Sequence, residues 1–267
     1  MSAPNLCGAI EPLAAYPFFS SRDADEARHK VARVFCPHEL RQVNTRTPFS
    51  SRHNLVRLGE TALNYLTYGT DVDINPGYLD SFYLVQMPLE GTAEIRCGQQ
   101  AMHSTPDTAT ILNPHEATRM HWRHDNRQLM LWIPKESVER RLAEHLGEPV
   151  NEPLTFDVAL SQREGMTRSW CRMLGDLADN IDHCGADWLR FRPTVAGLED
   201  CLIRGLLQLH RHNYSARLEQ PQDNARPRHL QRAIDYIHAH IEDAITVGDI
   251  ARAACVSVRA LEEGFRK

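Results

Sequence analysis

Short apolar runs separated by turn residues dominate the chain between positions 54 and 133. Each run mixes β-branched, aromatic and aliphatic side chains over the few residues typical of a strand. Turn formers such as Asn75-Pro76-Gly77 separate the runs. The predicted strands cover residues 55–58, 62–68, 81–87, 93–97, 108–112, 118–122 and 128–133. Many short strands at regular spacing predict a closed barrel or a sandwich.

Three segments with helical periodicity follow the strands. The first covers Lys135–Leu146, and Gly147 can terminate it as a C-cap residue. The second runs from 164 to 182. The third opens at Pro193 and carries an apolar stripe made of Val195, Leu198, Leu202, Leu206 and Leu209. That stripe could join two subunits or pack on the chain's own barrel, and the pattern leaves both open. A polar segment with two prolines, 213–227, then predicts an interdomain linker.

The C-terminal segment, 226–267, predicts three further helices. The first has one apolar stripe, made of Leu230, Ala233, Ile234, Ile237 and Ile241. The second begins at Thr246, whose hydroxyl can cap the helix with Asp249 as its capping-box partner. Its expected buried face consists of Val247, Ile250, Ala251 and Ala254. The third begins after Ser257, and its expected inward residues are Val258, Leu261 and Phe265.

The last two of these helices match the geometry of a DNA-binding helix-turn-helix, in which the second helix enters the major groove. The small Ala251 suits the close approach of the two helices. A helical hairpin used only for packing has the same periodicity, so the pattern alone leaves both readings open. The turn position often taken by Gly holds Cys255, for which a left-handed backbone conformation is costly.

The run Thr246–Lys267 resembles the first helix-turn-helix of the AraC/XylS family of bacterial transcription regulators. The matching motifs are Ile250-Ala251, Ser257-x-Arg259-x-Leu261 and Phe265-Arg266-Lys267. The family's DNA-binding module has two such units, whereas this sequence carries the first. We therefore expect a truncated regulator that binds promoter DNA weakly, because phosphate contacts set most of the affinity.

The same resemblance implies which side chains meet DNA. Arg259, Glu262 and Glu263 would reach base edges, where Arg can bind guanine and Glu can accept from cytosine. Ala260 and Arg266 would lie nearer the DNA backbone, with Ser257 at the start of the helix. Seven basic and six acidic side chains between 226 and 267 leave a net charge of +1. That balance is not the strongly basic footprint of a self-sufficient DNA binder.

A second resemblance lies among the strands, where Ser81–Gly91 and Ala93–Gly98 are similar to the cupin-like effector-binding domain of regulators related to XylS. It implies an α+β chain with a cupin-like barrel over 1–150 and a helical dimerisation or packing layer over 151–214. A linker over 215–225 and the helix-turn-helix segment over 226–267 complete this division. It also implies a small-molecule effector, a homodimer paired through the 193–212 helix, and contact with RNA polymerase if the protein is an activator.

Length and composition limit the class of protein. A chain of 267 residues with 42% apolar content can form two domains, and its formal charge of -5 argues against nonspecific binding to polyanions. Seven cysteines without paired spacing suggest a reducing compartment. Residues 1–19 lack a signal-peptide pattern, and no apolar run is long enough to span a bilayer. We therefore expect a cytoplasmic protein without membrane contact.

A metal-dependent cupin enzyme is a weaker alternative. Such enzymes converge imidazoles from a strand His-x-His pair on one ion. Here the His-x-His pairs, His210/His212 and His238/His240, fall in helical segments, where side chains two residues apart diverge. We therefore expect no metal, no cofactor and no catalytic residue. A further alternative is a small-molecule-binding barrel that lacks autonomous DNA binding and acts by forming mixed dimers.

The effector implied by the resemblance to benzoate-type regulators is a small aromatic carboxylate, which needs a cation and an aromatic wall. The candidate cations are Arg41, Arg46, Arg52 and His53, and the candidate wall residues are Tyr65, Tyr83, Trp122 and Trp132. An aromatic residue in a strand also fits plain core, and an arginine before a strand also fits a solvated surface. Either Leu63/Tyr65/Thr67 or Asn64/Leu66/Tyr68 faces the barrel interior, and the sequence does not decide which.

Overall fold

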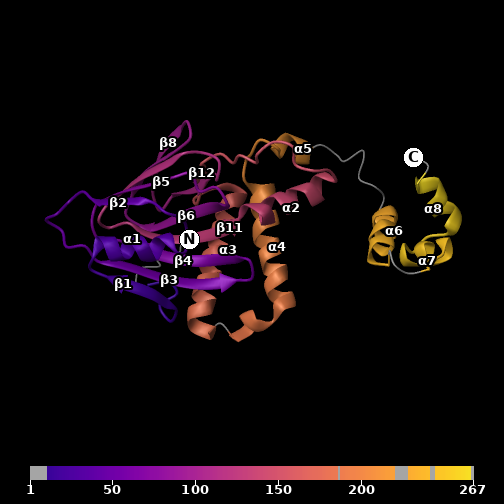
Figure 1. The fold of residues 1–267 in the computed structure, drawn as a ribbon, viewed down its shortest axis with the longest axis horizontal. Coiled ribbons are helices and arrows are strands. Elements are labelled where there is room, and N and C mark those ends of the chain that lie inside the picture. Colours follow the sequence, from indigo (N-terminus) through magenta and orange to yellow (C-terminus); the bar gives the residue numbers. More distant parts are fainter. Residues whose placement is uncertain (1–10, 186, 220–227, 241–243, 266–267) are drawn as a thin grey trace. The chain divides into compact units, whose positions relative to one another are not determined.

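The computed structural model of the chain describes residues 11–185, 187–219, 228–240 and 244–265. The chain forms two compact units, Met1–Arg217 and Leu218–Lys267. The first contains two β-sheets and most of the helices, and the second is helical (Figure 1). Among the described residues, no helix combines the length and the apolar character needed to cross a membrane.

Two antiparallel sheets build the first unit. The larger has seven strands in the order β1 (Pro17–Ser21), β3 (Ser51–Leu58), β4 (Thr61–Thr67), β11 (Arg127–Pro134), β6 (Phe82–Glu90), β9 (Thr108–Leu112) and β12 (Ala159–Ser161). The smaller has five strands in the order β2 (Glu39–Gln42), β5 (Val72–Gly77), β10 (Thr118–Trp122), β7 (Ala93–Cys97) and β8 (Gln100–Ser104). The predictions for β7, β9 and β10 are confirmed to the residue. The expected domain boundary at 150 is wrong, because β12 pairs with β9 and so extends the larger sheet beyond it.

The core lies between the two sheets and draws side chains from both. Leu66, Phe82 and Leu84 come from the larger sheet, and Ile95 and Trp122 come from the smaller one. On β4 the set that faces this core is therefore Asn64/Leu66/Tyr68, which settles the alternative left open by the sequence. The opposite set is also buried, since Leu63 and Tyr65 are 0% and 3% exposed.

Helices cover the other face of the larger sheet. They are α2 (Lys135–Leu146), α3 (Gly165–Cys184) and α4 (Arg192–Leu209), while α1 (Ala24–Ala32) lies beside β1 and β2. α3 and α4 run side by side and are joined at one end through the short 3₁₀ helix η1 (Asp187–Arg190) (Figure 1). α2 contacts β6 and β11, and α3 contacts β12. The predicted helix 135–146 is confirmed at both ends.

The apolar stripe of α4 is not available to a second subunit. Val195, Leu202 and Leu206 are each at most 5% exposed. The indole Nε1 of Trp170 on α3 donates a hydrogen bond of 2.9 Å to the carbonyl oxygen of Leu202. The interpretation of this stripe as a dimer surface is therefore wrong, because the stripe packs within its own chain. The expected linker is also wrong in its first part, because Ser215–Glu219 form the helix α5; 220–225 lie outside the described residues.

A buried carboxylate joins α4 to the sheet. Glu199 is 6% exposed, and its Oε1 accepts hydrogen bonds from the backbone N–H groups of Glu60 (2.7 Å) and Thr61 (2.8 Å) in the turn between β3 and β4. Gly59 is the first residue of this turn, with φ +64, and a side chain there would collide with the carboxylate. The contact therefore fixes α4 against the turn and requires glycine at position 59.

Replacing Glu199 should destabilise the first unit. Glu199→Ala leaves the buried N–H of Thr61 and the partly buried N–H of Glu60 without their acceptor, so we expect the free energy of unfolding in urea to fall by about 2–4 kcal/mol. Glu199→Gln keeps an acceptor oxygen in the same place and should lose much less. If alanine and glutamine cost the same, the hydrogen bonds are not what stabilises this contact.

The second unit packs three helices, α6 (Arg228–Ala239), α7 (Val247–Ala253) and α8 (Val258–Phe265). Its core consists of Leu230, Ala233, Ala251, Ala254 and Leu261. Three residues expected to be buried are instead 42–52% exposed, namely Val247, Val258 and Phe265. Those predictions are wrong, because apolar periodicity marks a face but does not say whether another element of the described chain covers it. Of the expected stripe on the first helix, Ile241 lies outside the described residues.

Candidate functional site

Two capped helices form the helix-turn-helix. At the start of α7, Thr246 Oγ1 accepts from the N–H of Asp249 (3.3 Å), and Asp249 Oδ2 accepts from the N–H of Thr246 (3.0 Å). The Thr246 hydroxyl also donates to Asp249 Oδ2 (2.6 Å), and this bond together with the one from the Thr246 N–H holds the pKa of Asp249 below its usual range. At the start of α8, Ser257 Oγ accepts from the N–H of Ala260 (3.2 Å). The predicted capping box is confirmed, and both helix starts are fixed by their own side chains.

The turn between these helices passes through Cys255 in a left-handed conformation, with φ +55. The N–H of Cys255 bonds to the carbonyl of Arg252 (3.1 Å), and the N–H of Val256 bonds to that of Ala251 (3.0 Å). These bonds close the end of α7 and turn the chain toward α8. The left-handed turn expected at this position is therefore present. Cys255 adopts it at a cost in conformational free energy, because its Cβ atom crowds the backbone there.

Cys255→Gly should stabilise the second unit by up to about 1 kcal/mol, because glycine adopts a positive φ without the clash of a Cβ atom. Protection of the α7 and α8 amides against hydrogen exchange in the full chain measures this change. Cys255→Ala keeps the Cβ atom and serves as the matched control, so it should give no gain. Equal protection in the glycine and alanine variants would contradict a strained turn.

The outer face of α8 presents charged side chains. Arg259 is 88% exposed at its side chain, and its Nε lies 3.0 Å from the Glu263 carboxylate one turn along. Ser257 and Glu262 are also exposed, and Ala260 is half-buried. Arg266 lies outside the described residues. The structure therefore gathers the predicted base-reading residues on one exposed face, where Arg259 is paired with Glu263.

The barrel interior is nearly filled. A cavity of about 40 Å³ remains between the sheets, close to the space that one water molecule occupies. Aliphatic and aromatic side chains form most of its wall, including Leu66, Phe82 and Leu84. Two thioethers, those of Met120 and Met130, also line it. An effector larger than water must therefore displace side chains to enter.

Two polar atoms of the cavity wall have no hydrogen-bond partner in the described part of the chain. They are the indole Nε1 of Trp122 and the Nε2 of His38. His38 Nδ1 lies 3.0 Å from the carbonyl oxygen of Cys36, so it carries the proton, and Nε2 is an acceptor. Burial lowers the pKa of His38 and keeps the imidazole neutral. The residues that line the cavity thus carry one donor and one acceptor without a partner among the described residues.

The cations predicted to bind a carboxylate do not meet in this interior. Arg41 is exposed and pairs with Asp73, Arg52 is exposed and pairs with Glu11, and Arg46 is exposed in the segment after β2. His53 is fully buried, and burial lowers its pKa to about 4. Its Nε2 lies 2.9 Å from Asn64 Oδ1. The carboxylate site expected from the sequence is therefore not assembled.

The predicted aromatic residues divide between two faces of the larger sheet. Trp122 lines the cavity, and Trp132 packs beside the core against Phe82, with ring centroids 5.6 Å apart. Tyr65 and Tyr83 point to the opposite face, where the Tyr83 hydroxyl donates to the carbonyl of Leu154 (2.7 Å). Tyr65 and Tyr83 lie on the face of the larger sheet that points away from the cavity, because successive residues of a strand face opposite ways. They therefore cannot form one wall with the two tryptophans.

Sequence reasoning missed His38 and Gln86 as lining residues. Alternation along β6 from Phe82 through Leu84 could have pointed to Gln86, whereas the segment before β2 carries no strand pattern that would place His38. No group of three or more His, Cys, Asp or Glu side chains suited to hold a metal ion occurs within the described ranges.

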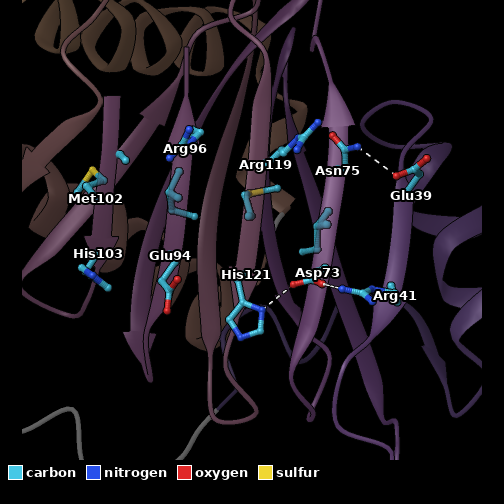
Figure 2. Close-up of a pocket in the computed structure, with 14 residues that line it drawn as sticks. Glu39, Arg41, Asp73, Asn75, Glu94, Arg96, Met102, His103, Arg119 and His121 are labelled. Atoms are coloured by element: carbon cyan, nitrogen blue, oxygen red, sulfur yellow. Dashed lines mark hydrogen bonds and ion pairs between the residues drawn. The ribbon is translucent and has the colours of Figure 1, made fainter. Parts of the chain in front are cut away.

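A wider hollow lies on the outer face of the smaller sheet. It measures about 650 Å³, and Figure 2 shows the side chains that line it. Asp73 receives hydrogen bonds from Arg41 and from His121, whose Nδ1 is 2.7 Å away. Partial burial raises the pKa of Asp73, but these two hydrogen bonds outweigh it and bring the pKa below its ordinary value. This face is charged, whereas the interior is apolar.

Comparison with known proteins gives the family. Residues 27–208 match the AraC-binding-like domain. A probable thc operon regulatory protein of Rhodococcus erythropolis is 31% identical over 252 residues, which cover 93% of this chain and 75% of the relative. The XylDLEGF operon transcriptional activator 1 of Pseudomonas putida is 23% identical, over 86% of this chain and 68% of its own length.

The fold agrees with these matches. The crystal structure of the AraC-like transcriptional activator CuxR superposes with a TM-score of 0.52 at 14% identity, covering 93% of this chain and 88% of that one. The chain belongs to the AraC family of transcription regulators. It is an effector-controlled DNA-binding regulator rather than an enzyme, with a cupin-like barrel followed by a helical segment.

Proposed function

We propose that the barrel of this regulator binds a neutral, mostly apolar effector and that α8 reads promoter DNA. The observation that supports the effector's chemistry is the pair of unpartnered polar atoms in the cavity wall, Trp122 Nε1 and His38 Nε2. A buried donor and acceptor without partners cost free energy, and a ligand that satisfies both regains it. An aromatic amide carries the required acceptor and donor.

The charge of the cavity wall argues against a carboxylate in the same place. No Lys or Arg lines the cavity among the described residues, and its one histidine is kept neutral by burial. A carboxylate would lose its hydration there without gaining a counter-charge. The flexible side chains of Met120 and Met130 line the cavity and can move aside for a ring.

Thermal unfolding of the full chain with matched ligands tests this proposal. We expect benzamide to raise the midpoint of the first unit and benzoate to leave it unchanged, since a ligand that binds only the folded state stabilises it. Trp122→Phe should weaken benzamide binding by roughly 3- to 10-fold through loss of one hydrogen bond. Ethylbenzene lacks the acceptor, so its binding should not respond to this substitution. Tighter binding of benzoate than of benzamide would contradict the proposal.

For DNA, we propose that Arg259 reads a base edge from the exposed face of α8. Its guanidinium can form two hydrogen bonds with guanine once it leaves Glu263. A single unit with a net charge near zero makes few phosphate contacts, so binding should be measurable only at low salt. The P. putida relative is named an activator, and we extend that direction of control to this chain.

Selection of bound sequences from a random DNA library, at low salt and with the full chain, tests this role. Arg259→Ala should relax the preference at one base pair, a loss of about 1–3 kcal/mol in discrimination. Arg252→Ala is the matched control, because Arg252 is equally exposed and pairs with Asp249 on α7; it should lower affinity evenly across sequences. If the unmodified chain selects no sequence at all, the alternative of a barrel without autonomous DNA binding is favoured.

Pairing of two chains and contact with RNA polymerase complete the proposal. Two copies would present two α8 helices to neighbouring half-sites and so add the phosphate contacts that one unit lacks. Because the apolar stripe of α4 is buried within its own chain, such pairing must use other surfaces.

A further inference from the structure

The hollow on the outer face of the smaller sheet is lined by two rows of polar side chains. Strand pairing places Arg41, Asp73, His121, Glu94 and His103 across the sheet in one row, as neighbours on β2, β5, β10, β7 and β8. The second row contains Glu39, Asn75, Arg119 and Arg96, and Figure 2 shows both rows. Since residues two apart on a strand share a face, both rows project into the same hollow.

Most of the charges in these rows are already paired. Asp73 is bound by Arg41 and His121, and Glu94 is bound by Arg123 at 3.1 Å. Glu39 accepts a hydrogen bond of 3.1 Å from Asn75. Neither Arg96 nor Arg119 has a hydrogen-bond or ion-pair partner for its side chain in the part of the chain that the structure describes.

These two arginines are also direct neighbours. Arg119 on β10 stands opposite Arg96 on β7, and like charges in that position repel each other. On its other side β10 faces an irregularity in β5 between Ile74 and Gly77, so no acidic residue of β5 stands opposite Arg119. Arg96 and Arg119 are paired positions of neighbouring strands and both lack an acidic partner, so one anionic group can attract both side chains and bind their N–H donors.

We propose that Arg96 and Arg119 bind the anionic group of a small organic ligand, a phosphate or a carboxylate, in this hollow. This second ligand site lies on the opposite side of the smaller sheet from the barrel cavity. A volume of about 650 Å³ falls within the range of small-molecule sites. Asn75 and His103 line the same hollow and can bond the rest of the ligand. The carboxylates of Glu39, Asp73 and Glu94 surround the pair and disfavour a long polyanion.

Titration calorimetry of the full chain at low ionic strength tests the site, with pyrophosphate as the phosphate probe and succinate as the carboxylate probe. We expect one of the two to bind at one equivalent per chain. Arg96→Gln and Arg119→Gln should each weaken that binding by at least about tenfold, since each removes a charged, paired donor. Arg57→Gln is the matched control, because Arg57 is an exposed arginine on β3, away from this hollow.

A stability measurement separates loss of binding from loss of folding. Because the two arginines repel each other, either glutamine variant should unfold at the same or a higher temperature than the unmodified chain without ligand. Absence of binding by both probes at millimolar concentration overturns the proposal, and so does an equal loss in the Arg57→Gln variant. Since benzamide binding concerns the barrel cavity alone, it should persist in both variants, so the two proposals fail independently.

Discussion

The larger sheet must bury both of its faces, and the arrangement of the first unit follows from that requirement. Its central strands, β4, β11 and β6, are buried along nearly their whole length. One face is covered by the smaller sheet and the other by α2, α3 and α4, so neither layer can be removed without exposing apolar surface. Within the described part of the first unit no second layer covers the smaller sheet, and β7 and β10 alternate buried residues with more exposed ones. The apolar interior between the sheets and the charged outer face of the smaller sheet therefore both follow from the need to bury the larger sheet.

The same difference decides which strands the sequence reveals. Apolar and polar residues alternate along β7 and β10 because one face of these strands is exposed to solvent, and the sequence predicts the bounds of both strands to the residue. β5 alternates only over Val72–Asn75 before Asn75-Pro76-Gly77 indicates a turn, and β8 is mostly polar, so neither carries a full strand pattern. Both are strands because neighbouring strands provide hydrogen-bond partners, and that information is not local. In the second unit the capping box at Thr246 depends only on residues three apart, and the sequence was sufficient there.

The candidate sites depend on pairing between distant positions, which a single sequence does not contain. By residue type, Arg41 and Arg52 could bind a carboxylate ligand, but in the structure they form ion pairs with Asp73 and Glu11. Arg96 and Arg119 are 23 positions apart in the chain, and only the register of β7 against β10 makes them neighbours. Trp122 could be recognised as a strand aromatic, whereas its unpartnered indole N–H required the full packing of the interior.

If Arg259 reads a base edge as proposed, its ion pair with Glu263 changes the free-energy cost of a wrong DNA sequence. An arginine that fails to find guanine returns to the carboxylate one turn away instead of remaining unpaired, so binding is an exchange of partners. Salt screens both the exposed internal pair and the contacts with phosphate. Under that proposal, total affinity falls steeply as salt rises. The difference in affinity between a right and a wrong base falls much less, because it compares two partners of the same guanidinium group. An ion pair on an exposed helix can in this way make sequence specificity less dependent on salt than affinity is.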